Sequence, residues 1–248
     1  MEKTKNTLSP GKLTYFTHPF SREYWAEAAR VFRQPKMLVL AAVIVALRVV
    51  VKSLRVPVAD NLYVTFGFFF NAAGSMVYGP LMGLLGGAVS DTLGAILFPS
   101  GAYFFPYIIS EMLGSLIFAL FLWRVKFSAW RVILSRFAVT VLVNLVCDPI
   151  ISIWYYKLVL GKSYAFFTVQ RLVKNVVLFP VQALLLTLFL SALIPALRRT
   201  GYISADQPKV LLEKKHYIVI AIMTAVAAGL LLFYIFAWPD INAALKAA

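Results

Sequence analysis

Long apolar runs separated by short connections dominate the sequence, and this pattern determines the surroundings in which the chain can fold. A helix needs roughly 20 mostly apolar residues to cross a bilayer. About seven runs of that kind occur, near residues 37–54, 61–79, 81–98, 103–123, 132–159, 171–197 and 216–238. With 61% hydrophobic and only 14% charged residues, the composition also lies outside the soluble class. We therefore predict an all-α integral membrane protein.

Basic residues gather in alternate connections, which predicts the orientation of the chain. Lys and Arg concentrate before residue 37, at 124–136 and at 198–215. Because cytoplasmic loops carry an excess of these residues, we assign the three regions and the N-terminus to the cytoplasm. Seven crossings then put the C-terminus outside. The net charge of +14 is accordingly interpreted as typical of a protein in a lipid bilayer, not of one that binds nucleic acid.

An amphipathic helix is predicted in the polar tail that precedes the first apolar run. In "SREYWAEAARVF" the apolar residues recur at helical intervals, and charged residues occupy the other face. The apolar residues are Tyr24, Trp25, Ala28, Val31 and Phe32. Such a helix is expected to lie on the inner membrane surface. Docking into a groove of a partner protein is the alternative.

Two acidic residues, Asp91 and Glu111, stand in the apolar flanks of a turn at Pro99, Ser100 and Gly101. The predicted orientation puts this turn on the outer face. An ionised carboxylate inside a membrane is costly unless it is paired or hydrated. We therefore expect both side chains to face a polar pocket beneath the turn or a neighbouring helix. Ligand contact and hydrogen bonding between helices both remain open.

A second polar group lies at the outer end of the sixth apolar run. Arg171 and Lys174 begin this run, and Asn175 and Gln182 continue a stripe on the face of Arg171. A polar stripe on a membrane helix faces protein or water, and two cations at a cavity mouth suit an anionic ligand. Other polar and aromatic residues have simpler interpretations. Arg48, Lys52 and Arg55 are expected to extend to the headgroups, and Tyr103 belongs to an interfacial aromatic cluster that could also stack on a planar ligand.

Catalytic chemistry is not predicted. His18 and His216 lie far from the acidic residues in the sequence, and no His, Cys or carboxylate cluster has zinc spacing. Gly161-Lys162-Ser163 resembles the end of a phosphate-binding loop, but Tyr156 stands where that motif requires glycine. We predict no enzyme activity, no metal and no cofactor. Substrate recognition remains as the role of the outer polar residues.

The stretch "NLYVTFGFFFNAAGSMVYGPLMGLLGGAVSDTLGAILFPSGAYFFPYIISEMLGSLIFALFL" (61–122), followed by "RLVKNVVLFPVQALLL" (171–186), resembles the S components of energy-coupling factor (ECF) vitamin transporters. Within that family it is most similar to the folate-specific members. The resemblance covers about residues 37–197. It implies a six-helix protein of the prokaryotic plasma membrane that captures a vitamin from outside. It also implies docking onto a transmembrane coupling subunit bound to two ATPase subunits, followed by toppling that carries the vitamin inward.

The resemblance gives two sets of residues an expected role. Ala42 and Ala46, four residues apart in the first run, correspond to an AxxxA motif that packs against the coupling subunit. A pterin ring suits aromatic walls with acidic or amide partners, and its glutamate tail suits cations at the mouth. The residues expected around the pocket are Asp91, Tyr103, Glu111, Arg171, Lys174 and Asn175.

Three regions are expected along the chain. Residues 1–36 form a cytoplasmic tail with the interfacial helix, 37–200 the six-helix substrate-binding core, and 201–248 a linker plus a seventh transmembrane helix that the family core lacks. An S component for another vitamin, such as pantothenate, is one alternative. A stand-alone secondary carrier is another, but such carriers show inverted repeats and we find none that is convincing. Uptake without coupling subunits would distinguish the carrier from the S component.

Overall fold

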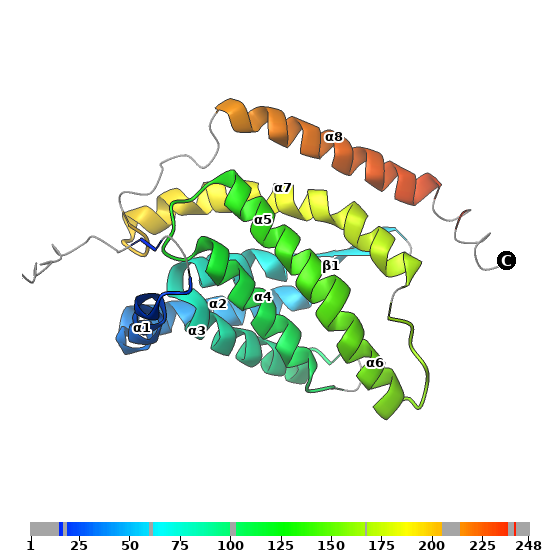
Figure 1. Cartoon of the computed structure of the whole chain (residues 1–248), viewed down its shortest axis with the longest axis horizontal. Coiled ribbons are helices and arrows are strands. Elements are labelled where there is room, and N and C mark those ends of the chain that lie inside the picture. Colours follow the sequence, from blue (N-terminus) through cyan, green and yellow to red (C-terminus); the bar gives the residue numbers. More distant parts are fainter. Residues whose placement is uncertain are drawn as a thin grey trace, which may run out of the picture.

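Helices packed side by side make up most of the computed structural model (Figure 1), which describes residues 15–16, 19–59, 62–99, 103–166, 168–204, 214–237 and 241. The helices are α1 (Arg22–Arg30), α2 (Pro35–Lys52), α3 (Gly67–Leu97), α4 (Tyr107–Leu122), α5 (Ala129–Ala138), α6 (Asp148–Leu158), α7 (Val169–Arg199) and α8 (Lys214–Phe236). A short 3-10 turn, η1 (Val31–Arg33), follows α1, and a π-helical stretch, η2 (Val139–Cys147), joins α5 to α6. Two strands, β1 (Arg55–Ala59) and β2 (Leu62–Thr65), pair antiparallel.

Within the described residues, three helical stretches are long and apolar enough to cross a membrane by length and composition. They are Gly67–Leu97, which is interrupted at Gly79, Ala129–Leu158 and Arg171–Arg199. The segment Arg22–Arg33 followed by Pro35–Lys52 passes the same test as a pair, although the two parts are bent by 85°. α4 is a shorter apolar helix. The prediction of a multi-pass helical membrane protein is therefore confirmed.

The β-hairpin corrects one detail of the sequence prediction. The run expected to be helical from residue 61 instead begins with strand β2, and helix α3 starts only at Gly67. β-branched and aromatic residues in "LYVT" favour strands, and Pro57 in the partner strand cannot continue a helix. Apolar content alone does not distinguish such a strand from the start of a helix, so "all-α" is wrong for this segment.

Helix α3 folds back on itself at Gly79 and Pro80. Gly79 has φ of 83° and ψ of −173°, a conformation that residues with a side chain rarely adopt. Ser75 Oγ lies only 3.3 Å from the position of a Cβ atom built on Gly83. Eight residues of straight helix would separate these two positions by about 12 Å, so the arms 67–78 and 80–97 lie side by side. The predicted boundary between the runs 61–79 and 81–98 coincides with this turn.

Helix α1 packs on the end of the bundle formed by this turn and the end of α4. Ser21 caps α1 by accepting a hydrogen bond from the Tyr24 amide, 3.2 Å away. The Tyr24 ring is 1% exposed and meets the Trp123 ring edge-on, 4.8 Å between centroids. Burial raises the pKa of Tyr24. Protein therefore covers Tyr24, Ala28 and Val31 of the predicted apolar face, whereas Trp25 on the same face is 37% exposed. The position of the helix on the inner membrane surface, or in a partner groove, stays a prediction. An apolar face fits lipid and protein equally well, so the pattern did not distinguish them.

The connections predicted to be cytoplasmic meet at this same end. The Phe16 amide donates to the Arg124 carbonyl, 3.0 Å away, and Lys36 Nζ donates to the Thr200 carbonyl, 2.6 Å away. Lys36 also lies 4.2 Å from the centre of the Tyr202 ring. The basic regions before residue 37, near 124 and near 200 thus share one end of the bundle.

Helix α8 lies along α7 at the edge of the bundle (Figure 1). A small apolar pocket lies between it, α5 and α7. Its lining residues are Ala129, Trp130, Ile133, Leu184, Thr187, Val219 and Met223. Most described side chains of α8 are exposed, as expected of a helix that contacts the bundle along one side only.

Candidate functional site

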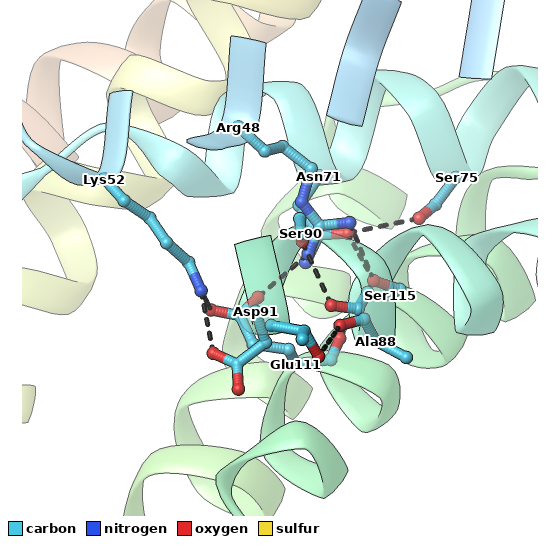
Figure 2. A network of polar contacts seen from close by, with 11 residues as sticks. Arg48, Lys52, Asn71, Ser75, Ala88, Ser90, Asp91, Glu111 and Ser115 are labelled. Atoms are coloured by element: carbon cyan, nitrogen blue, oxygen red, sulfur yellow. Dashed lines mark hydrogen bonds and ion pairs between the residues drawn. The ribbon is translucent and has the colours of Figure 1, made fainter. Parts of the chain in front are cut away.

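A network of charged and polar side chains lies between α2, α3 and α4 (Figure 2). Arg48 Nη2 lies 2.8 Å from Glu111 Oε2. Lys52 Nζ lies 2.9 Å from Asp91 Oδ1 and 3.0 Å from Glu111 Oε1. The Arg48 side chain is only 2% exposed. Arg48 and Lys52 therefore turn inward, and the prediction that they extend to the headgroups is wrong. Pairing with a carboxylate on a neighbouring helix offsets part of the cost of an unpaired charge in the membrane.

Neutral polar groups continue this network toward the first arm of α3. Arg48 Nη1 donates to Ser115 Oγ, 3.2 Å away. Ser115 donates to Asn71 Oδ1 over 2.8 Å, and Ser75 donates to the same oxygen over 3.3 Å. We call the whole set the ion-pair network: Arg48, Lys52, Asn71, Ser75, Asp91, Glu111 and Ser115.

Close approach of α3 and α4 holds the ion-pair network together. A Cβ atom on Gly87 would lie 2.9 Å from the Glu111 carbonyl oxygen, which is closer than two such atoms come in proteins. A Cβ on Gly94 would lie 3.0 Å from Lys52 Cδ. Glycine at these positions lets the helices and the Lys52 side chain fit. One polar atom of the network is unsatisfied: Asp91 Oδ2 is buried and has no hydrogen-bond partner.

A second set of polar side chains lies between α4, α6 and α7. Arg171 Nη2 donates to Tyr164 Oη over 2.7 Å and to Ser152 Oγ over 3.3 Å. Tyr107 Oη and Ser152 Oγ are 3.2 Å apart, and Ser110 donates to Asp148 Oδ1. We call this the Arg171 cluster: Tyr107, Ser110, Asp148, Ser152, Tyr164 and Arg171. Arg171 Nη1 is buried and has no partner.

The polar stripe predicted on α7 faces the protein. Below Arg171, Asn175 accepts a hydrogen bond from Asn144 Nδ2 over 2.9 Å, and Gln182 accepts one from Arg136. Asn144 and the neighbouring Asp148 lie where the π-helical stretch ends before Pro149. Pro149 has no N–H to donate, so the regular helical bonding is interrupted there, and π-helical turns occur often at functional sites.

Four of the six predicted pocket residues lie in or beside these two sets. Asp91 and Glu111 belong to the ion-pair network, while Arg171 and Asn175 lie in or beside the Arg171 cluster. Helix α4 joins the sets, because Ser110 faces Asp148 and its neighbour Glu111 faces Lys52. Tyr103 is 48% exposed and Lys174 is half-buried, and neither has a hydrogen bond to another described residue. The turn at Ser100 and Gly101 lies outside the described residues.

Sequence reasoning missed several members of both sets. Arg48 and Lys52 share a helix face at a spacing of four residues, and Glu111 and Ser115 do the same. That matching periodicity is the one signal that would have paired the two helices. Tyr107, Ser152 and Tyr164 gave no such signal, because single hydroxyl groups are common in membrane helices.

Charged side chains that are buried between the helices of a multi-pass bundle mark substrate and ion pathways in many membrane transport proteins. Within the described residues, no group of three or more His, Cys, Asp and Glu side chains could hold a metal ion. The family model for the S component of the ECF-type riboflavin transporter matches residues 33–195, more than half of the chain. The protein belongs to this family of ECF transporter S components, which are transport proteins and not enzymes.

Several individual proteins are similar to this chain. A protein named folate transporter FolT from Clostridium novyi is 37% identical over 134 residues, which are 54% of this chain and 74% of the relative. Another of that name, from Leuconostoc mesenteroides, is 31% identical over 152 residues, 59% of this chain and 80% of the relative. The crystal structure of FolT bound with folic acid has 29% identity and a TM-score of 0.52, and the match covers 61% of this chain and 89% of that one.

Proposed function

We propose that this protein is a folate-binding S component. It captures folate from outside the cell and delivers it inward by docking onto a transmembrane coupling subunit, which two separate ATPase subunits power. The similarity to two proteins named as folate transporters and to a structure with bound folic acid carries this proposal. The matching family model bears the name of riboflavin, so riboflavin is the vitamin against which folate must be tested.

Arg171 is the residue that best suits the charged end of folate. Its guanidinium is held by Tyr164 and Ser152 through Nη2, which leaves the buried Nη1 without a partner. A guanidinium fixed in this way can donate a charge-assisted hydrogen bond to a carboxylate. Lys174 follows three residues later on α7 and adds a second positive charge.

The pterin end is assigned to the side of α3 and α4 that carries Asp91. A pterin presents a row of N–H donors and acceptors, and Asp91 Oδ2 is a buried acceptor without a donor. Glu111, paired with Arg48 and Lys52, holds that wall in position. Asn175 supplies an amide beside the Arg171 cluster, and the exposed Tyr103 supplies a ring at the entrance.

The regions of the chain follow from the same proposal. Residues 37–200 form a six-helix binding core, counting the two arms of α3 separately. Residues 1–36 form a cytoplasmic segment, and α8 within 201–248 is an additional anchor. The N-terminus lies in the cytoplasm and the C-terminus outside. A cysteine introduced at Ala248 in a Cys147→Ser background would react with a membrane-impermeant maleimide on intact cells, whereas one at Lys3 would not.

The coupling subunit is proposed to dock on α2. Ala42 and Ala46 are exposed on this helix, and small side chains let a partner helix approach closely. Replacing both with leucine is expected to abolish co-purification with the coupling subunit while folic acid still binds. Leu47→Phe, which also adds bulk at an exposed position but on a different face of the same helix, is the matched control.

The deciding experiment is equilibrium binding to the purified full-length protein, followed by quenching of its tryptophan fluorescence. Folic acid, riboflavin, pantothenate and thiamine are titrated separately. Saturable one-to-one quenching at the lowest concentrations by folic acid supports the proposal. If riboflavin or pantothenate binds more tightly, that vitamin is the ligand instead of folate, and the assignment to the S-component family is unaffected.

A further inference from the structure

Arg136 is a buried cation that neither the ion-pair network nor the Arg171 cluster uses. It lies on α5, between α3 and α7, and is 5% exposed. Its Nη2 donates to Gln182 Oε1 on α7. Its guanidinium carbon lies 4.9 Å from the centre of the Phe68 ring on α3. Both contacts are with uncharged groups.

No ion pair joins Arg136 to a carboxylate in the part of the chain that the structure describes. This differs from Arg48, the other fully buried arginine, which meets Glu111. A positive charge in the membrane interior is costly without a negative partner. The ring face and the amide of Gln182 offset only part of that cost.

Two hydrogen-bond donors of this region have no partner. Arg136 Nε is one, and the hydroxyl of Thr140, one turn further along the same face, is the other. Thr140 is itself 5% exposed. Hydroxyl groups in membrane helices usually donate to the carbonyl one turn earlier, as Thr187 and Ser191 do here over 2.7 and 2.6 Å. Thr140 makes no such bond, so its donor remains available.

We propose that Arg136, Thr140 and Gln182 form an anion-binding position inside the helix bundle, separate from Arg171. A single negative charge is what the guanidinium requires, with Nε and the Thr140 hydroxyl as donors. Gln182 lies 11 residues after Arg171 on α7, which is about 16 Å along a helix. Either a carboxylate of the transported vitamin or a small inorganic anion such as chloride has this chemistry. The vitamin would then place its glutamate tail here instead of at Arg171, because one tail cannot reach both cations. The first source rests on the proposed function, and the second does not.

The first arm of the test measures the thermal stability of the ligand-free full-length protein in detergent. Chloride is replaced by the bulky sulfonate anion MES at constant ionic strength. If chloride occupies the position, the unfolding temperature rises with chloride concentration and saturates. The rise is absent in Arg136→Met and persists in Arg131→Met, which removes the same charge from the half-exposed beginning of α5.

The second arm measures folic acid binding in MES buffer. If the vitamin supplies the charge, the dissociation constant rises about tenfold or more in Arg136→Met, as expected for one lost charge-assisted hydrogen bond. Binding of the uncharged fragment 6-hydroxymethylpterin changes little, because it has no carboxylate to lose. A wild-type protein that binds no folic acid would refute the proposed function while the chloride arm still decides this inference.

The proposal is overturned if chloride leaves the wild-type stability unchanged and Arg136→Met binds folic acid as tightly as the wild type. If Arg136→Met does not fold, Thr140→Val takes its place. In that variant the loss of one hydroxyl is expected to weaken the effect that the wild type shows, either the rise of the unfolding temperature with chloride or the affinity for folic acid. An unchanged response in both arms overturns the proposal as well.

Discussion

The ion-pair network and the Arg171 cluster meet along α4, but their charged groups are paired differently. In the network, two cations meet two carboxylates, and Lys52 contacts both of them. In the cluster, Arg171 is held by two hydroxyl groups and keeps one buried nitrogen without a partner. The nearby carboxyl group of Asp148 accepts a hydrogen bond from Ser110 and forms no ion pair with a described residue.

This difference indicates different roles. A balanced set of buried charges holds helices in register, because removing any member leaves another one unpaired. A cation whose hydrogen bonds are only partly satisfied has capacity to bind a ligand. We therefore expect substitutions at Arg48, Lys52 and Glu111 to act mainly on stability and substitutions in the cluster mainly on affinity. Asp91, whose Oδ2 has no partner, is expected to affect both.

Glu111→Gln is expected to have the largest effect, and that effect is on stability. Arg48 would then lose its ion pair, and Lys52 would keep only the one with Asp91. Removing one partner of a buried ion pair typically costs about 3–5 kcal/mol. Denaturant or thermal unfolding in detergent measures the loss. Glu23→Gln on α1 removes the same charge from an exposed position and should leave the stability unchanged.

A double substitution, Arg48→Met with Glu111→Leu, separates charge balance from shape. Because it removes both charges together, it should recover much of the stability that Glu111→Gln loses. If Glu111→Gln instead folded as stably as the wild type and lost folic acid binding, the contrast between the two regions would be reversed.

Arg171→Met is expected to have the next largest effect, on affinity. Hydrogen bonds to charged groups contribute about 1.5–3 kcal/mol, so folic acid should bind about 10- to 100-fold more weakly. The unfolding temperature should change little, because the substitution leaves no carboxylate that had been ion-paired with Arg171. Fluorescence titration and a melting curve on one preparation give both values. A large loss of stability with intact affinity would assign Arg171 to the scaffold.

Local chemistry explains which parts of the fold could be predicted from the sequence. Apolar length located the helices, and Gly79 followed by Pro80 marked the fold-back of α3. The β-hairpin was missed because its residues continue an apolar run. The packing of α1 against the bundle was missed because the surface around Trp123, on which it packs, is formed by segments that are distant in sequence.

The site was predicted by residue type but not by partner. Asp91 and Glu111 were singled out because charge in an apolar segment is rare, and Arg171 because it begins a polar stripe. Their partners lie 39 residues away for Lys52 and Asp91 and 63 residues away for Arg48 and Glu111. A single sequence does not show which residues so far apart in the chain meet in space, unless two helix faces carry matching periodicities.

Asn175→Leu tests the boundary between the two regions and should have a smaller effect. Its side chain accepts from Asn144 and donates to the Arg171 carbonyl, so the substitution removes support from beneath the cluster. Hydrogen bonds between membrane helices contribute about 0.6 kcal/mol on average and up to about 1.7. Stability should fall by that amount, and affinity severalfold through Arg171. Asn144→Leu breaks the same inter-helix bond from the other side and should match the stability loss with a smaller effect on affinity.

Lys174→Met should have the smallest effect and shows how the cluster uses charge. Lys174 is half-buried and lies one turn from Arg171 on α7 without a hydrogen bond to a described residue. Its attraction for an anionic ligand then passes through solvent, where such interactions contribute about 0.2–1 kcal/mol. Affinity should fall no more than about fivefold. This difference from the wild type should vanish at about 1 M salt, because the screening length there is about 3 Å. The loss caused by Arg171→Met should persist at the same salt concentration, since a direct buried contact is screened far less. Equal salt dependence for both variants would mean that Arg171, too, acts at a distance.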